Sequence, residues 1–234
     1  DEMRFCIPLP VLCPFFRPMK KQLLPPQLAS GLHFEIVLED FRTALTHFSG
    51  GDITGYEISG LSFMLDTIEM TDDVQKTINM ESASDGLEYA YERIFTSISQ
   101  QPTAQTSMSQ QIRKAVSQAC FAISIPMSSA NKIDITKDSL TSLPFDVTSF
   151  QYRLGSLYFP HQRIDDNNID ACEAFCIAQQ VYDKFQHPYN ENSINMHSFK
   201  NKFGIMSASF EKDTHLNMSG LPINNSRVLE LNCE

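Results

Sequence analysis

Alternation of apolar and polar positions marks short strands along much of the chain. Residues 32–38 show it most clearly, with an apolar side chain at every even position. A period of two is typical of a sheet with one solvated face. Further runs with this character lie at 3–9, 61–70, 121–125, 150–154, 206–210 and 228–233. In 61–70 the parity changes near Asp66, which indicates a β-bulge. The pattern predicts a mostly β fold.

Two stretches carry the helical period instead. Residues 85–98 open with the capping-box spacing of Asp85 and Glu88 and place apolar residues on one face. The second helix opens after residues 166–168, and His187-Pro188 ends it. Its apolar stripe consists of Ala171, Ala174, Phe175, Ala178, Val181, Tyr182 and Phe185. The sequence therefore predicts strands with two inserted helices.

A polar stretch at 97–111, rich in Ser, Thr and Gln, predicts an exposed loop or an interdomain connection. A weaker break lies at 128–132. The chain begins and ends inside strand-like runs, and complete domains seldom do so. We therefore expect a fragment.

Composition narrows the function classes. A hydrophobic content of 42% suffices for a packed core, and no apolar run reaches the length of a membrane helix. The formal net charge of −10 disfavours extensive direct binding of nucleic acid, because each phosphate contact needs a cation. The six cysteines are scattered and are expected to be reduced thiols in an intracellular compartment.

Candidate chemical sites fail on their spacing. Cys172 and Cys176 lie four apart on the second helix, but no second pair completes a zinc site, so a buried thiol pair is favoured. The calcium-like run 166–170 has Ala171 where Gly is needed and Ile177 where Glu is needed, so a helix N-cap explains it better. Metalloprotease, nucleophile-elbow and phosphate-loop motifs are absent. We expect no catalytic residue, cofactor or metal, and no enzyme activity.

Two phrases, 150–160 and 219–229, combine strand alternation with turn residues and carry no catalytic group. Tyr152, Arg153, Tyr158 and Phe159 are types enriched at contact hot spots, and core packing with one satisfied arginine explains them equally well. Candidate turn residues are Gly155, Pro160, Gly220, Pro222, Asn224, Asn225 and Ser226. The Asn and Ser side chains can fix a turn by bonding nearby backbone. Arg227 can hold a carboxylate across a subunit seam or within its own subunit.

Four stretches together resemble the major capsid protein of polinton-like viruses and related small eukaryotic DNA viruses, including virophage-like ones. They are 5–16 with 23–39, then 55–69, 150–160 and 219–229. The resemblance implies a double jelly roll truncated at both ends. Residues 1–100 would form the C-terminal part of the first jelly roll and 111–234 the N-terminal part of the second. The helix at 170–185 would be an insertion between strands.

The resemblance also implies a function. Such subunits form homotrimers that act as pseudo-hexagonal capsomers of an icosahedral shell. The partners would be neighbouring capsomers, penton proteins and minor capsid proteins. The protein would be made in the host cytoplasm or nucleus and reside in the virion. The alternative is a lectin-like β-sandwich that binds carbohydrate, which exposed aromatics clustered with Asn and Asp in one concave pocket would favour.

Overall fold

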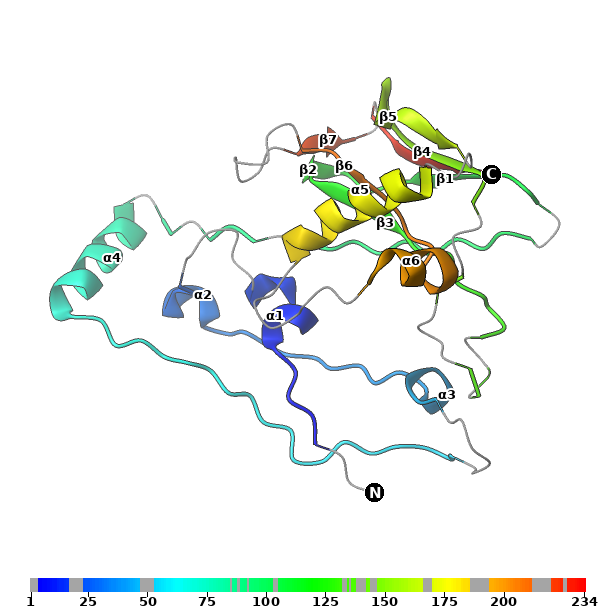
Figure 1. Ribbon diagram of the computed structural model, residues 1–234. Coiled ribbons are helices and arrows are strands. Elements are labelled where there is room, and N and C mark those ends of the chain that lie inside the picture. Colours follow the sequence, from blue (N-terminus) through cyan, green and yellow to red (C-terminus); the bar gives the residue numbers. More distant parts are fainter. Residues whose placement is uncertain are drawn as a thin grey trace. The chain divides into compact units, whose positions relative to one another are not determined.

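Figure 1 shows the computed structural model of the 234-residue chain. The chain divides into two compact units. The first comprises residues 1–41 and 52–94, and the second comprises 42–51 and 95–234. The residues that the structure describes are 4–16, 23–46, 53–84, 86–87, 89–91, 93–102, 105–131, 134, 136–137, 142–143, 147–165, 170–185, 194–211, 220–224 and 227–234.

The first unit contains short helices and extended segments. The helices are α1 (Leu9–Leu12), the 3-10 helix η1 (Pro14–Phe16), α2 (Pro26–Ala29) and α4 (Asp72–Ser84). Of α3 (Phe41–Ala44), only Phe41 belongs to the first unit. Prolines in the first turns of α1 and α2 preset the helical backbone where no N–H is required. Asp72 and Asp73 begin α4, where negative charge complements the helix dipole.

Three strands expected in this unit are not formed. The described residues of 3–9, 32–38 and 61–70 include no β-strand, and Leu32, Ile36 and Leu38 remain 41%, 50% and 51% exposed. Alternation places the apolar side chains on one face of an extended segment. A strand also needs a neighbouring strand with which its backbone N–H and C=O groups form hydrogen bonds. Among the described residues, no segment of this unit supplies that neighbour. The bulge expected near Asp66 therefore has no ladder to interrupt.

The helix predicted over 85–98 is also wrong, and Gly86 explains why. Its φ is +82°, and its N–H donates to the carbonyl oxygen of Glu81 at 3.1 Å. A left-handed glycine bonded back to the last turn is a helix C-terminus. Gly86 thus ends α4, and the described residues after it, within 87–98, are not helical. The Asp85 and Glu88 of the expected capping box lie outside the described residues.

The second unit confirms the mostly β expectation, with eight strands among its described residues. They are β1 (Met108–Ile112), β2 (Val116–Ala119), β3 (Phe121–Ser124), β4 (Ser149–Leu154), β5 (Leu157–Asp165), β6 (Met206–Ser209), β7 (Leu221–Ile223) and β8 (Leu229–Cys233). Every pairing of these strands is antiparallel. The strands expected at 121–125, 150–154, 206–210 and 228–233 are therefore present as β3, β4, β6 and β8.

The pairing is nested along the sequence. β1 pairs with β8, β2 with β7, β3 with β6 and β4 with β5. A further contact between β4 and β8 builds a four-stranded sheet in the order β1-β8-β4-β5, while the other two pairs remain separate. The polar loop expected at 97–111 ends earlier than predicted, because β1 begins at Met108. In β1, polar residues lie between Met108 and Ile112, and these two apolar side chains pack against the core.

Helix α5 (Asp170–Phe185) is present as predicted and packs on β6 (Figure 1). Ala174, Ala178 and Val181 of its stripe are buried, and small side chains let the helix lie close to the strand. α6 (Met196–Lys202) follows, and Asn195 caps it by accepting a hydrogen bond from the Ser198 N–H at 2.8 Å. The N-cap and stop signals expected at 166–169 and 187–188 lie outside the described residues.

Cys172 and Cys176 are exposed, so the expected buried thiol pair is wrong. Positions two residues from the buried Ala174 and Ala178 lie on the opposite side of a helix. The real core joins alternate residues of the strands to α5, α6 and the segment around β6. It consists of Phe150, Tyr152, Leu154, Ile164, Ala174, Ala178, Phe199, Ile205, Met206, Ala208, Phe210, Leu221, Ile223, Leu229 and Leu231.

Candidate contact surface

The four-stranded sheet has an apolar inner face and a polar outer face. In register, Tyr152 of β4 stands opposite Leu231 of β8, and both are fully buried. The next pair, Arg153 and Glu230, alternates to the other side and is partly solvated. Because successive side chains of a strand point to opposite faces, the whole polar set shares the outer face. That outer face carries the exposed polar residues of the sheet.

One polar network crosses all four strands. The Ser109 hydroxyl of β1 donates to Glu230 Oε1 of β8 at 2.6 Å. Glu230 Oε2 lies 4.0 Å from the Arg153 guanidinium of β4. That guanidinium lies 5.9 Å from the ring centre of Tyr158 in β5, and its Nε donates to the Gly155 carbonyl at 2.9 Å. Arg153 is thus held in place by three neighbours.

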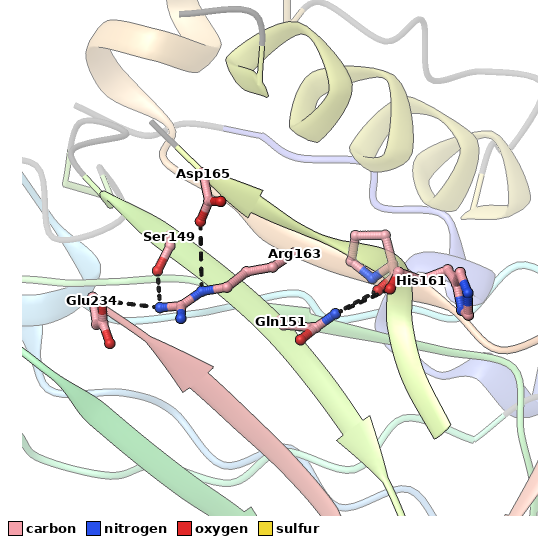
Figure 2. A network of polar contacts seen from close by, with 7 residues as sticks. Ser149, Gln151, His161, Arg163, Asp165 and Glu234 are labelled. Carbon is pink, nitrogen blue, oxygen red and sulfur yellow. Dashed lines mark hydrogen bonds and ion pairs between the residues drawn. The ribbon is translucent and has the colours of Figure 1, made fainter. Parts of the chain in front are cut away.

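A second network lies where β4 begins (Figure 2). Arg163 of β5 forms ion pairs with Asp165 at 3.6 Å and with the Glu234 carboxylate at 3.0 Å. It also donates to the Ser149 hydroxyl. The arginine therefore ties the edge strand to β4 and to the residue that follows β8. These contacts hold neighbouring strands together.

The side chain of Gln151 forms hydrogen bonds with β5 where the β4–β5 ladder is interrupted. The register shifts between Phe150 and Tyr152, so the residues of β5 around His161 lack backbone partners from β4. The Gln151 side-chain amide donates to the carbonyls of Pro160 at 3.1 Å and His161 at 3.4 Å (Figure 2). A side chain therefore satisfies acceptors that the bulge leaves open.

The predicted contact residues divide between core and surface. Tyr152 is completely buried, with its hydroxyl 2.8 Å from Ser124 Oγ and 3.0 Å from the Met206 carbonyl oxygen. Burial raises the pKa of this phenol well above its ordinary value. Phe159 packs edge-to-face on Phe210, with ring centres 5.0 Å apart. Of these four predicted contact residues, Arg153 and Tyr158 are exposed, and both lie on the outer face.

Both predicted turn glycines lie where a larger side chain would be disfavoured. Gly155 joins β4 to β5 with φ +64°, and a Cβ there would lie 3.2 Å from Arg227 Cγ. A Cβ at Gly220 would lie 2.5 Å from the carbonyl oxygen of Ala119. The latter approach lets β7 start against the end of β2. Pro160 lies in β5 after a cis peptide bond, and Pro222 lies in β7.

The turn between β7 and β8 contains the candidate turn residue Asn224, whose side chain accepts a hydrogen bond from nearby backbone. Asn224 and Arg227 form an isolated antiparallel bridge. The Arg227 N–H donates to both the side-chain and the main-chain oxygens of Asn224, each at 3.0 Å. Asn225 and Ser226 lie outside the described residues. The Arg227 guanidinium is exposed, and no described carboxylate forms an ion pair with it.

Sequence reasoning missed Ser149, Gln151, Arg163, Asp165 and Glu234. Arg163 and Asp165 are two apart in a strand, and their shared face was a usable signal. The Gln151 role was not readable, because it depends on the register shift. Within the described residues, no group of three or more His, Cys, Asp or Glu side chains could hold a metal, and no helix is long and apolar enough to cross a bilayer.

Comparisons of the chain with protein-family models, with curated proteins and with solved structures each found no match.

Proposed function

We propose that the chain is part of a major capsid subunit with a double jelly-roll fold, and that it serves a structural role in a virion. The nested strand pairing carries this proposal. A jelly roll is an antiparallel ribbon of eight strands folded over on itself, in which the first strand pairs with the last and each later strand with an earlier one. The pairs β1–β8, β2–β7, β3–β6 and β4–β5 follow this scheme.

One feature departs from the regular scheme. In an ordinary jelly roll the eighth strand lies beside the third, whereas β8 lies beside β4 here. β2 and β3 are separated by a single residue, Cys120. Counting β2 and β3 as one broken strand makes β4 the third strand of the ribbon. That count gives β4 the regular place beside β8 but leaves seven strands instead of eight, so the proposal rests on the nested pairs and not on the order of strands in the sheet.

The outer face supports a role in contact rather than chemistry. Its charged side chains brace strands, and Arg153 with Tyr158 offers the residue types that anchor interfaces. Shell subunits need shaped edges, fixed turns and complementary charges. Gly155, Gly220 and Asn224 supply the fixed turns in this chain.

The test is assembly of the complete gene product. We expect trimers by light scattering and pseudo-hexagonal particles by negative-stain electron microscopy. Leu231→Asp is the negative control. A charge at this fully buried position should unfold the unit and thereby abolish assembly. A wild-type protein that stays monomeric at high concentration contradicts the capsid role.

The carbohydrate-binding alternative requires a different arrangement of exposed side chains. It needs exposed aromatics beside Asn and Asp side chains, and the exposed Tyr158 has Arg153 as its neighbour. Glycan-array binding that Tyr158→Ala abolishes would replace the capsid proposal with this alternative.

A further inference from the structure

Three arginines gather at one end of the four-stranded sheet, and we name this group the arginine corner: Arg113, Arg153 and Arg227. The register places them. Ile112 and Leu154 both stand opposite Leu229, so the residues next to these positions share one end of the sheet. Arg227 also lies against the β4–β5 turn, where its Cγ would contact a Cβ on Gly155. Segments more than a hundred residues apart in sequence thus bring their cations together.

The arginine corner carries an excess of positive charge on an acidic chain. Glu230 is the one described carboxylate paired there, 4.0 Å from Arg153. Arg113 donates instead to the neutral side chain of Gln111 at 3.3 Å. No described carboxylate pairs with Arg227, and all three arginines are exposed. Lys114 adds a fourth cation beside Arg113, with its Nζ 4.9 Å from the ring centre of Phe95.

Exposed apolar surface adjoins these cations. Leu157 and Tyr158, just beyond the β4–β5 turn, are 44% and 45% exposed. Arginine and tyrosine are the residue types that most often anchor interfaces, and a nearby aliphatic side chain helps to exclude water from an ion pair. The corner therefore fits an anionic protein segment better than a lone dissolved anion.

The chain itself contains a complementary segment in its other unit. Residues 66–73 hold four carboxylates, Asp66, Glu69, Asp72 and Asp73, and no cation. All four are exposed, and none forms an ion pair with another described residue. We name residues 66–73 the acidic segment. Guanidinium groups bind carboxylates through two parallel hydrogen bonds, which gives such a contact direction as well as strength.

We propose that the arginine corner of one copy binds the acidic segment of a second copy. The inference rests on the proposed assembly and names one of its contacts. A head-to-tail contact of this kind joins different surfaces of the two copies, and a closed ring follows when the rotation between them closes. Nucleic acid fits less well, because a net charge of −10 repels a polyphosphate and the corner offers few cations.

Charge exchange between the two surfaces tests the contact. A corner variant carries Arg113→Glu with Arg227→Glu, and a segment variant carries Asp66→Lys with Glu69→Lys. Lys200→Glu with Lys202→Glu is the control for the corner variant, since it changes the net charge equally at exposed positions of α6. Circular dichroism checks that each full chain is folded. Sedimentation velocity then measures association at about 0.05 M and about 0.5 M NaCl, because added salt shortens the range of surface charges.

We expect wild-type association that weakens in high salt. Each charge-reversed variant alone should associate at least about tenfold more weakly, while the control should stay within about twofold of wild type. An equimolar mixture of corner and segment variants should recover a heterodimer. That recovery separates a contact between copies from one within a copy, which mixing cannot restore.

The inference and the capsid proposal fail in different ways. If the corner variant still forms wild-type capsomers, or the mixed variants do not bind each other, the contact is refuted and the capsid role stands. If the charge exchange behaves as expected but no capsomer forms, the contact stands and the capsid role is refuted. Wild-type binding to a labelled DNA duplex that the corner variant loses, without association of copies, would assign the corner to nucleic acid instead.

Discussion

Residues 32–38 and 150–154 carry the same alternating pattern and end in opposite states. In the first, Leu38 is half exposed and none of the described strands pairs with it, whereas Leu154 in the second is buried between β5 and β8. The difference lies in what surrounds each run. Strand β4 pairs with β5 across a two-residue turn and with β8 on its other side. Alternation thus fixes which residues share a face, and a neighbouring strand decides whether that face becomes a core.

The largest predicted effect compares two leucines from these settings. Leu231→Ala should lower the free energy of unfolding by about 2–5 kcal/mol, because it opens a cavity in a fully buried site. Leu38→Ala should change it by no more than about 0.5 kcal/mol, since Leu38 is 51% exposed. Urea unfolding followed by circular dichroism measures both. Equal losses would show that the two runs are packed alike.

Two glycines give the next comparison. Gly220→Ala should destabilise the protein by about 1–3 kcal/mol, because the new methyl group meets the Ala119 backbone. Gly55 in the first unit has open space around it, so Gly55→Ala should be neutral or slightly stabilising. The same urea titration decides. A Gly220→Ala protein as stable as wild type would mean that β2 and β7 are not held this closely.

Alkaline pH should act on the second unit through Tyr152. Burial raises its pKa above the unfolded value of about 10, so the folded state retains a proton that the unfolded state releases. The stabilisation is present below that value and is lost as the pH rises above it. Urea midpoints at pH 8 and pH 11 should differ less in Tyr152→Phe than in wild type. Cys233, whose pKa burial also raises, should keep part of the difference.

Tyr158→Phe is the matched control for this pH experiment, because Tyr158 is exposed on the same sheet. It should leave the alkaline loss of stability unchanged. A loss that Tyr158→Phe removes and Tyr152→Phe does not would contradict the assignment to the buried ring.

The smallest predicted effect concerns two buried serines. Ser207 in β6 is buried, and its hydroxyl has no hydrogen-bond partner among the described residues. Ser207→Ala should therefore raise the free energy of unfolding by about 1 kcal/mol. Ser149→Ala should lower it by a similar amount, because its hydroxyl accepts from Arg163. A thermal melt of each protein checks the sign, and a destabilised Ser207→Ala would reveal a missed partner.

The sequence predicted the second unit better than the first, for a local reason. The stripe from Ala174 to Val181 and the alternation of Phe150, Tyr152 and Leu154 each have a partner in the fold, so period and burial agree. In residues 85–98 the capping-box spacing predicted the start of a helix. Gly86 instead ends α4, because it has a left-handed backbone conformation and bonds back to the last turn. A glycine directly after an acidic residue could have signalled that ending.

The contact surface was only partly predictable. The turn roles of Gly155 and Asn224 follow from residue type, and both residues lie at turns of the second unit. The burial of Tyr152 and the exposure of Tyr158 depend on register, which a one-residue shift would have exchanged. The arginine corner depends on pairing between residues far apart in sequence, so no local sequence pattern predicts that these arginines lie together.

The nested strand pairing also sets an order of folding. The β4–β5 hairpin closes over two residues, whereas Ser109 and Glu230, which bond across β1 and β8, are separated by 121 positions. Loop closure over long separations is slow, and each inner pair that forms shortens the remaining distance for the next. The ribbon should therefore close from its middle outward. The outermost strands would then pair only after translation of β8, and until that moment the edges of β1 and β4 would be open to pairing with other chains.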